Sequence, residues 1–242
     1  MHLVEMLRLV RLMMIFRSDN KQLGLEMIRD TLTKIIEKHQ SKDDDQVRDY
    51  IGASIIGSDC LRQIWYEFKG TKAESVPTKT RRTWAIGKKL ERLIFGWLKD
   101  AGAQVQVHDY THHAKDMPYF QGHFDGLITV RQKLSILEIK TAKDASFKIF
   151  VKSGVKLWNP QYFAQIQSYM GMSGIHSTYI LVLNKDNSDL SDELVLFDEE
   201  YYQQLEQKAL MISTAVIEPP RINGSPMYFK CKMCKFNKVC HI

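Results

Sequence analysis

Apolar residues recur every three or four positions in several stretches of this sequence, and that period predicts amphipathic helices. The segment from Met1 to about Gln40 predicts two helices, with a break at Ser18 to Asn20. A polar linker from Ser41 to Arg48 follows them. Ser54 is then expected to cap a further helix, and another is expected from Thr80 to Lys99.

The middle of the chain alternates apolar and polar residues, which is the period of β-strands. The expected strands cover residues 104–108, 122–130, 134–140, 177–183 and 194–197, the last as an edge strand. The expected helices between and after them run from Asn159-Pro160 to about Met172 and from Asp198 to about Val216. This order predicts an α/β fold in which a mixed central sheet, starting with a three-stranded meander, is flanked by helices.

Composition places the chain among ordinary globular proteins. It has 242 residues, of which 44% are hydrophobic and 26% charged, so a disordered tail or a fibre is excluded. The net charge of +6 suits a polyanionic partner. No long uncharged apolar run predicts a membrane span, and Arg8 and Arg11 interrupt the apolar N-terminus, which argues against a signal peptide. We therefore expect a cytoplasmic protein of a bacterial, archaeal or phage-infected cell, with an organelle-targeting helix as the alternative.

Two acids and a lysine are the first candidates for chemistry. Glu138 and Lys140 stand two apart on an expected strand, so their side chains share one face, while Leu137 and Ile139 share the other. If the strand that carries Asp125 pairs beside it, two carboxylates converge at a spacing that suits Mg²⁺. Such a cation activates water and offsets charge on a phosphodiester, and Lys140 would orient that water.

Other enzyme classes find little support. The chain has no Gly-x4-Gly-Lys-Ser/Thr loop for a nucleotide-driven motor and no motif for a Ser-His-Asp or Cys-His hydrolase. His108, His112 and His113 are expected in a loop, and His123 shares a face with Asp125 if the strand is regular. Core positions are expected for the tryptophans at mostly apolar helical positions, Trp65, Trp84, Trp97 and Trp158, of which Trp158 is the one expected to contact a base if any does.

Taken together, these motifs resemble the PD-(D/E)XK nuclease superfamily, in its RecB-like branch that includes lambda-type exonucleases. The motifs of that branch match, in chain order, Gly87 and Glu91 (G-x3-E), Gly122, Asp125 and Gly126 (G-x-x-D-G), Glu138 and Lys140 (E-x-K), and Gln165 and Tyr169 (Q-x3-Y). Glu91 stands where many members carry histidine. The resemblance implies a restriction-endonuclease-like core.

The resemblance also implies roles for these residues. The expected metal-binding set is Glu91, Asp125, Glu138 and Ile139, and the expected metal is Mg²⁺ or Mn²⁺. Lys140 is expected to position the nucleophilic water. Gln165 and Tyr169 are expected to orient the lysine and the substrate phosphate, which completes the catalytic set.

The four cysteines form a second pattern. Cys60 stands alone, whereas Cys231, Cys234 and Cys240 form C-x2-C-x5-C near the end of the chain. This arrangement resembles the iron-sulfur subgroup of the branch, typified by CRISPR-associated adaptation exonucleases and the AddB nuclease domain, which implies a 4Fe-4S cluster as a staple. Ser54, Cys60 and Arg62 also resemble the start of that subgroup's domain. The same thiolates, or His241 in place of one, suit Zn²⁺, so zinc is the alternative.

The expected function is a metal-dependent deoxyribonuclease that acts as an exonuclease on single-stranded or unwound DNA. Residues 49–242 are expected to form the nuclease domain and residues 1–48 a helical extension. The alternative is a non-catalytic nucleic-acid-binding adaptor of a recombination, repair or CRISPR adaptation complex; a third is a zinc-stapled interaction domain. Expected partners are DNA and a helicase, recombinase or CRISPR integration protein, with no membrane. Lysines and aromatic residues near the last cysteines suit phosphate contact and base stacking.

Overall fold

The computed structural model describes residues 32–40, 48–108 and 110–242. The chain divides into two compact units, one of residues 1–45 with 77–82, the other of residues 46–76 with 83–242. In the first unit, residues 32–40 are helical, and the apolar Leu32 and Ile35 are exposed. The helix expected near Met1 and most of the expected polar linker lie outside the described residues.

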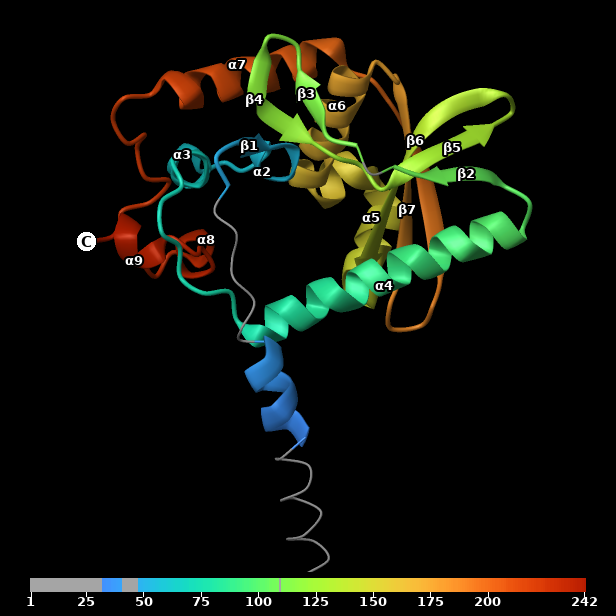
Figure 1. The fold of residues 1–242 in the computed structure, drawn as a ribbon, viewed down its shortest axis with the longest axis horizontal. Helices are drawn as coiled ribbons and strands as arrows, with labels where there is room; N and C mark the ends of the chain where they lie inside the picture. Colours follow the sequence, from blue (N-terminus) through green and yellow to red (C-terminus); the bar gives the residue numbers. More distant parts are fainter. Residues whose placement is uncertain (1–31, 41–47, 109) are drawn as a thin grey trace, which may run out of the picture. The chain divides into compact units, whose positions relative to one another are not determined.

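Two mixed sheets form the framework of the second unit (Figure 1). The larger has the order β2-β5-β6-β7-β8, and only β6 and β7 pair in parallel. The smaller has the order β1-β4-β3, with β1 and β4 parallel. The strands are β1 (Ile51–Gly52), β2 (Gln104–Val107), β3 (His112–Ala114), β4 (Met117–Gly122), β5 (Gly126–Val130), β6 (Lys133–Ala142), β7 (Ser177–Asn184) and β8 (Leu190–Leu196).

Helices cover both faces of the five-stranded sheet. The helices are α2 (Ala53–Ile56), α3 (Leu61–Phe68), α4 (Thr78–Asp100), α5 (Asp144–Trp158), α6 (Pro160–Ser173), α7 (Glu199–Thr214), α8 (Phe229–Lys232) and α9 (Asn237–Cys240). On one face Phe95 of α4 packs in a cluster with Leu137 and Ile139 of β6. On the other face α5 and α6 pack against Ile136 and its neighbours. Within the described ranges, none of the helices combines the length and the apolar composition that a bilayer crossing requires.

Much of the expected architecture is confirmed. The fold is a mixed α/β arrangement flanked by helices, and β2, β5 and β6 form the expected antiparallel meander. Two of the expected helix starts are confirmed: the side chain of Asn159 accepts hydrogen bonds from the backbone at the start of α6, and Asp198 does the same for α7. β8 is an edge strand, as expected, although it begins earlier, at Leu190.

Two boundaries are corrected by the structure. Ser54 caps no helix, because it lies inside the short α2, and the helix that follows begins after Cys60 instead. The expected strand over residues 122–130 is two strands, since the chain leaves the smaller sheet at Gly122 and enters the larger one at Gly126. His123 lies in the connection between the two and is exposed.

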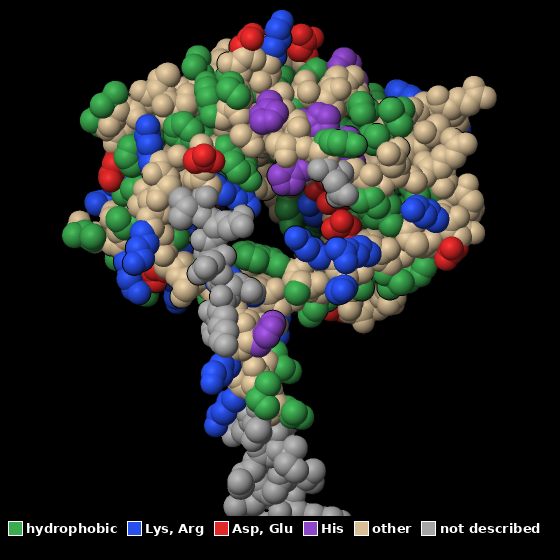
Figure 2. All heavy atoms as spheres, in the orientation of Figure 1, with side chains coloured by type: hydrophobic (Ala, Val, Ile, Leu, Met, Phe, Trp, Pro, Cys, Tyr) green, Lys and Arg blue, Asp and Glu red, His purple; other side chains and the backbone are tan. Residues whose placement is uncertain are grey.

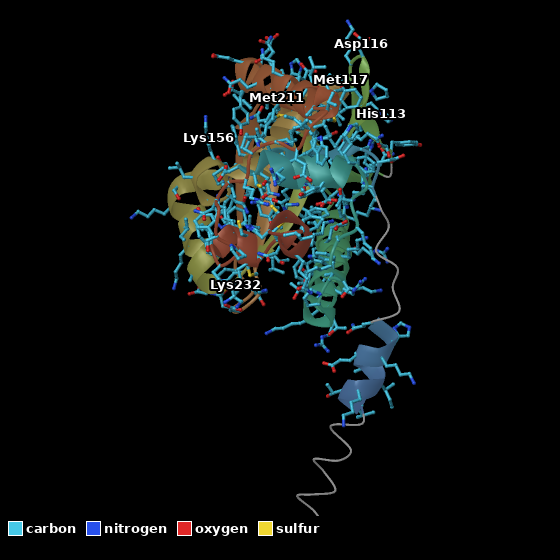
Figure 3. The ribbon with its side chains drawn as sticks, turned by 90° about the vertical axis from the view of Figure 1, so that its left-hand side faces the viewer. His113, Asp116, Met117, Lys156, Met211 and Lys232 are labelled. Atoms are coloured by element: carbon cyan, nitrogen blue, oxygen red, sulfur yellow. The ribbon has the colours of Figure 1, made fainter. Side chains whose placement is uncertain are left out.

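Three features were not expected from the sequence. α5 was not predicted; the chain kinks inside it, at a positive φ of 71° for Gly154. The hairpin of β3 and β4, which turns at Asp116, was also missed, so His112 and His113 lie on a strand rather than in a loop (Figure 3). The side chains of Trp84 and Trp97 are 56% and 44% exposed, so the prediction that these two tryptophans are core residues is wrong.

Candidate active site

β6 places Glu138 and Lys140 on the face that is covered by α5 and α6. Glu138 is only 1% exposed, and its Oε1 accepts a hydrogen bond from the Lys140 ammonium, with which it forms an ion pair. The Lys140 Nζ also lies 4.9 Å from the ring centroid of Tyr162 on α6. Leu137 and Ile139 are buried on the opposite face, as the alternation predicted. The strand therefore holds a buried acid and its counter-charge side by side.

Asp125 reaches the same strand from the connection between β4 and β5. Its Oδ2 accepts a hydrogen bond of 2.8 Å from the backbone N–H of Ile139. The ladder between β5 and β6 ends at the pair Gly126 and Leu137, so no strand carbonyl faces this N–H. The Asp125 carboxylate accepts the hydrogen bond from this N–H in place of a strand carbonyl. This hydrogen bond fixes Asp125, which lies in an irregular connection, against β6.

Two glycines of the motif allow close approach of the surrounding elements. A Cβ on Gly122 would lie 2.7 Å from Cε1 of Tyr169, and a Cβ on Gly126 would lie 2.5 Å from Cζ of Phe95. Both distances are far below van der Waals contact, so any side chain would push α6 or α4 away from the acids. Gly87 differs, because a Cβ there would meet no atom within 4 Å.

The carboxyl groups are electrostatically linked. Burial, followed by the charge of Asp125, raises the pKa of Glu138 to about 7. Burial also raises the pKa of Asp125, against the opposing effects of Lys140 and the Ile139 N–H. Burial and then Asp125 raise the pKa of Glu91 on α4. Burial alone would lower the pKa of Lys140, but Glu138 and Asp125 outweigh it and raise that pKa.

α6 contributes Gln165 and Tyr169, which are both buried. Gln165 Nε2 donates to the Tyr169 hydroxyl at 2.5 Å. Burial and the nearby Glu138 charge raise the pKa of Tyr169 well above its ordinary value, which places the phenol beside the acids. Tyr162 lies one turn before Gln165 on α6, and it was not among the site residues predicted from the sequence. The spacing of Tyr162, Gln165 and Tyr169 by three and four positions places them on one face of a helix and could have indicated it.

The donor set fits a hard cation. Glu138 Oε2 is buried and has no hydrogen-bond partner among the described residues, which is costly unless a positive group meets it. Mg²⁺ prefers one or two carboxylates and keeps several waters, so Asp125 and Glu138 suffice as protein ligands. Within the described part of the chain, no three or more His, Cys, Asp or Glu side chains stand together in metal-binding geometry.

The four cysteines line one cavity of about 40 Å³. Cys60 precedes α3, and the other three come from the segment around α8 and α9; all are free thiols. His241 lines the same cavity, and its Nε2 is buried without a hydrogen-bond partner among the described residues. The fold thus brings the distant Cys60 to the C-terminal cysteines, although the thiols do not stand in metal-ligand geometry.

Ion pairs fasten the same C-terminal segment to α3 and its neighbours. Arg62 pairs with Glu218 at 3.0 Å and donates from Nε to the Pro219 carbonyl at 2.6 Å. Three tail lysines pair with upstream acids: Lys230 with Asp59, Lys235 with Glu67, and Lys238 with Glu74. Phe236 is buried against Tyr66, so it is a core residue and not the base-stacking residue that the sequence suggested.

The family described as "YqaJ-like viral recombinase domain" matches residues 48–176, about half of the chain. The chain belongs to the YqaJ-like viral recombinase domain family. The matched range contains every residue of the candidate active site but ends before the three C-terminal cysteines. No curated protein matches the sequence of this YqaJ-like domain.

Solved structures share the fold of this YqaJ-like domain. An alkaline exonuclease from Laribacter hongkongensis is 15% identical, with a TM-score of 0.53 over 69% of this chain and 87% of that chain. The same exonuclease in complex with dAMP has 15% identity and a TM-score of 0.54 over 68% and 86%. The protein SSO0001 has 17% identity and a TM-score of 0.51 over 88% and 95%. At these identities the likeness establishes the fold.

Proposed function

We propose that this YqaJ-like domain is a deoxyribonuclease that uses Mg²⁺ or Mn²⁺ and degrades DNA from its ends, with single-stranded or unwound DNA as substrate. The observation that carries the proposal is the buried Glu138 carboxylate, which lies beside Asp125 and Lys140 and has one oxygen without a hydrogen-bond partner among the described residues. The fold shared with an alkaline exonuclease supports the reaction class. The nuclease domain in this proposal is residues 49–242, and it acts in the cytoplasm.

In the proposed mechanism, Asp125 and Glu138 would hold the cation together with Ile139, and Glu91 would support the metal or its water. The cation, when bound, lowers the pKa of water and offsets the negative charge of the phosphodiester. Lys140 orients the attacking water, and its position between Glu138 and the Tyr162 ring keeps the ammonium in place. Gln165 and Tyr169 orient the lysine and the phosphate.

The test is cleavage of end-labelled single- and double-stranded DNA in Mg²⁺, Mn²⁺ or EDTA. We expect metal-dependent cleavage by the natural protein and its loss in Asp125→Asn. Asp116→Asn is the matched control, because this exposed aspartate lies in the hairpin turn, where its φ of 60° suits asparagine equally. Asp116→Asn should cleave normally. Binding of DNA without cleavage under every condition would favour the non-catalytic adaptor instead.

We propose further that the cysteine cavity holds a 4Fe-4S cluster, with Zn²⁺ as the alternative metal. The four thiols that line one cavity support this proposal, and the buried His241 Nε2 adds a possible nitrogen donor for zinc. A cluster there would tie Cys60 to the C-terminal segment and stabilise the folded state. A helicase or recombinase is the expected partner, because the chain carries no nucleotide-binding loop of its own.

Metal analysis of protein purified without oxygen tests this second proposal. We expect iron and acid-labile sulfide in equal amounts, and a loss of both with a lower unfolding temperature in Cys234→Ser. Met233→Ser is the control, because this neighbouring side chain is 85% exposed. Zinc without iron would establish the alternative, and a metal-free protein whose stability is unchanged by Cys234→Ser would reject both.

A further inference from the structure

Two histidines meet edge to edge beside the candidate active site. The Nε2 atoms of His108 and His112 are 2.7 Å apart, and the ring planes differ by 18°. Rings stacked face to face are separated by about 3.4 Å or more, so a 2.7 Å contact requires that the imidazoles meet through their edges. The ring centroids, 4.9 Å apart, agree with this geometry. The two rings therefore form one nearly flat surface, joined by a hydrogen bond.

Phe124 lies against this surface from one side. Its ring is 4.3 Å from the His108 centroid at 13° and 5.0 Å from the His112 centroid at 19°. Phe124 itself is 2% exposed, whereas both histidines are partly exposed. One face of the imidazole pair is thus covered by a buried aromatic ring.

The pair joins the two sheets at the candidate active site. His108 directly follows β2 of the larger sheet, and His112 begins β3 of the smaller one. The backbone N–H of His108 donates to the Asp125 carbonyl at 3.2 Å. Phe124, one residue before Asp125, also meets the ring of Tyr169 edge-on at 5.8 Å. Several histidine side chains gather on one face of the molecule next to acidic and basic groups (Figure 2).

We propose that the face of the His108–His112 pair opposite Phe124 is a platform on which an unpaired nucleobase at a DNA end stacks. The inference rests on the proposed nuclease function and adds to it a binding site for the base. A flat surface two imidazole rings wide matches the extent of a nucleobase, and the Phe124 ring holds it rigid from below. Base stacking on aromatic side chains tolerates every sequence, because each base has a π-face.

The surroundings favour a base over a phosphate. Burial, followed by the nearby His108, lowers the pKa of His112. Tyr110 is 70% exposed and its ring centroid lies 5.2 Å from that of His108. A phosphate would instead need cationic donors. A stacked terminal base beside Asp125 would place the adjoining phosphodiester near the acids. A surface two imidazole rings wide covers one base rather than a base pair, so the platform predicts preference for single-stranded or frayed ends.

The experiment uses the full chain in EDTA, so that DNA is bound without being cut, and oligonucleotides that carry 2-aminopurine at the 5′ end, the 3′ end or an internal position. Stacking quenches this base. We expect strong quenching at one end and little at the internal position. Replacing the terminal base by an abasic site should weaken binding to the natural protein about tenfold.

Three variants separate stacking from a structural role. His112→Ala should lose the terminal quenching and bind base-bearing and abasic ends equally. His112→Phe keeps an aromatic surface and should retain both effects. His113→Ala is the matched control, because alternation along β3 places the His113 side chain on the other face, where its Nδ1 lies 3.0 Å from the Pro118 carbonyl oxygen. Its binding should match that of the natural protein.

These measurements distinguish a failure of the platform from a failure of the proposed nuclease function. Equal affinity of the natural protein for base-bearing and abasic ends overturns the platform, whether or not His112→Ala folds. The platform is also overturned if quenching survives in His112→Ala. In either case metal-dependent cleavage would persist, and the proposed nuclease function would stand. No binding of any oligonucleotide and no cleavage would instead reject the proposed function itself.

Discussion

Glu138 has almost no contact with solvent, and burial raises the pKa of its carboxyl group to about 7 from an ordinary 4.5. The folded protein therefore binds this proton more tightly than the unfolded chain does. The resulting stabilisation is complete below the ordinary pKa and disappears as the pH rises through about 7. A cation bound by the deprotonated carboxylate would reverse the trend at high pH.

This linkage predicts how metal-free protein responds to pH. Between pH 4.5 and 8 in EDTA, the natural protein should lose stability relative to Glu138→Gln, by at most about 3 kcal/mol. Urea unfolding at several pH values measures the difference, and taking it against the variant cancels the contribution of acids that do not interact with Glu138. Added Mn²⁺ at pH 8 should stabilise the natural protein and not Glu138→Gln. A constant difference between the two proteins across this range would contradict the assigned burial.

At the level of elements, the approach of β4 to α6 depends on Gly122. Any Cβ there would collide with the Tyr169 ring and with Ala53 Cβ, at 2.7 and 2.8 Å. Both neighbours are buried, so neither moves without disturbing the core. The glycine of the strand motif is thus a packing requirement, and it acts on the same tyrosine that stands beside the acids.

Gly122→Ala should therefore destabilise the protein by about 1–3 kcal/mol and reduce cleavage, because α6 must shift. Gly87→Ala provides the contrast: a Cβ there meets nothing, and alanine favours the interior of α4 by about 0.5–1 kcal/mol. Urea unfolding of both variants checks the two opposite signs. A stable Gly122→Ala variant with full activity would show that Tyr169 is not constrained by this contact.

Across the whole molecule, the net charge of +6 does not reveal which cations meet DNA. Lys235 is already paired with Glu67 at 2.7 Å, in the segment that fastens the tail to α3. Lys88 is exposed on α4, and its charge opposes the rise in the pKa of Glu91 that burial causes, so it lies near the candidate active site. The two lysines should therefore behave differently toward a polyanion.

Titration of single-stranded DNA binding across salt concentrations compares them. Lys88→Ala should weaken binding and reduce the slope of log affinity against log salt by about 1. Lys235→Ala should leave the slope unchanged, because its charge is neutralised within the fold. Equal changes in both variants would show that the tail also contacts the phosphates, as the run of lysines alone had suggested.

Local patterns were sufficient for a large part of this fold. The period of two placed Glu138 and Lys140 on one face of β6, and the capping residues Asn159 and Asp198 marked the starts of α6 and α7. Local patterns failed where a long-range contact overrides them. Val155, just after the Gly154 kink, donates its N–H to Glu193 of β8 at 2.7 Å, and this support for α5 comes from 38 positions away.

By itself, the sequence determined the class of the fold, the pairing of an acid with a lysine on one strand, and the positions of the motif residues, because these depend on periodicity and on neighbours along the chain. Only the tertiary structure decided that Asp125 replaces a strand carbonyl at Ile139, that Cys60 joins the distant cysteines at one cavity, and that His108 and His112 meet over Phe124. These contacts join separate elements, and side-chain periodicity carries no information about which elements pack together.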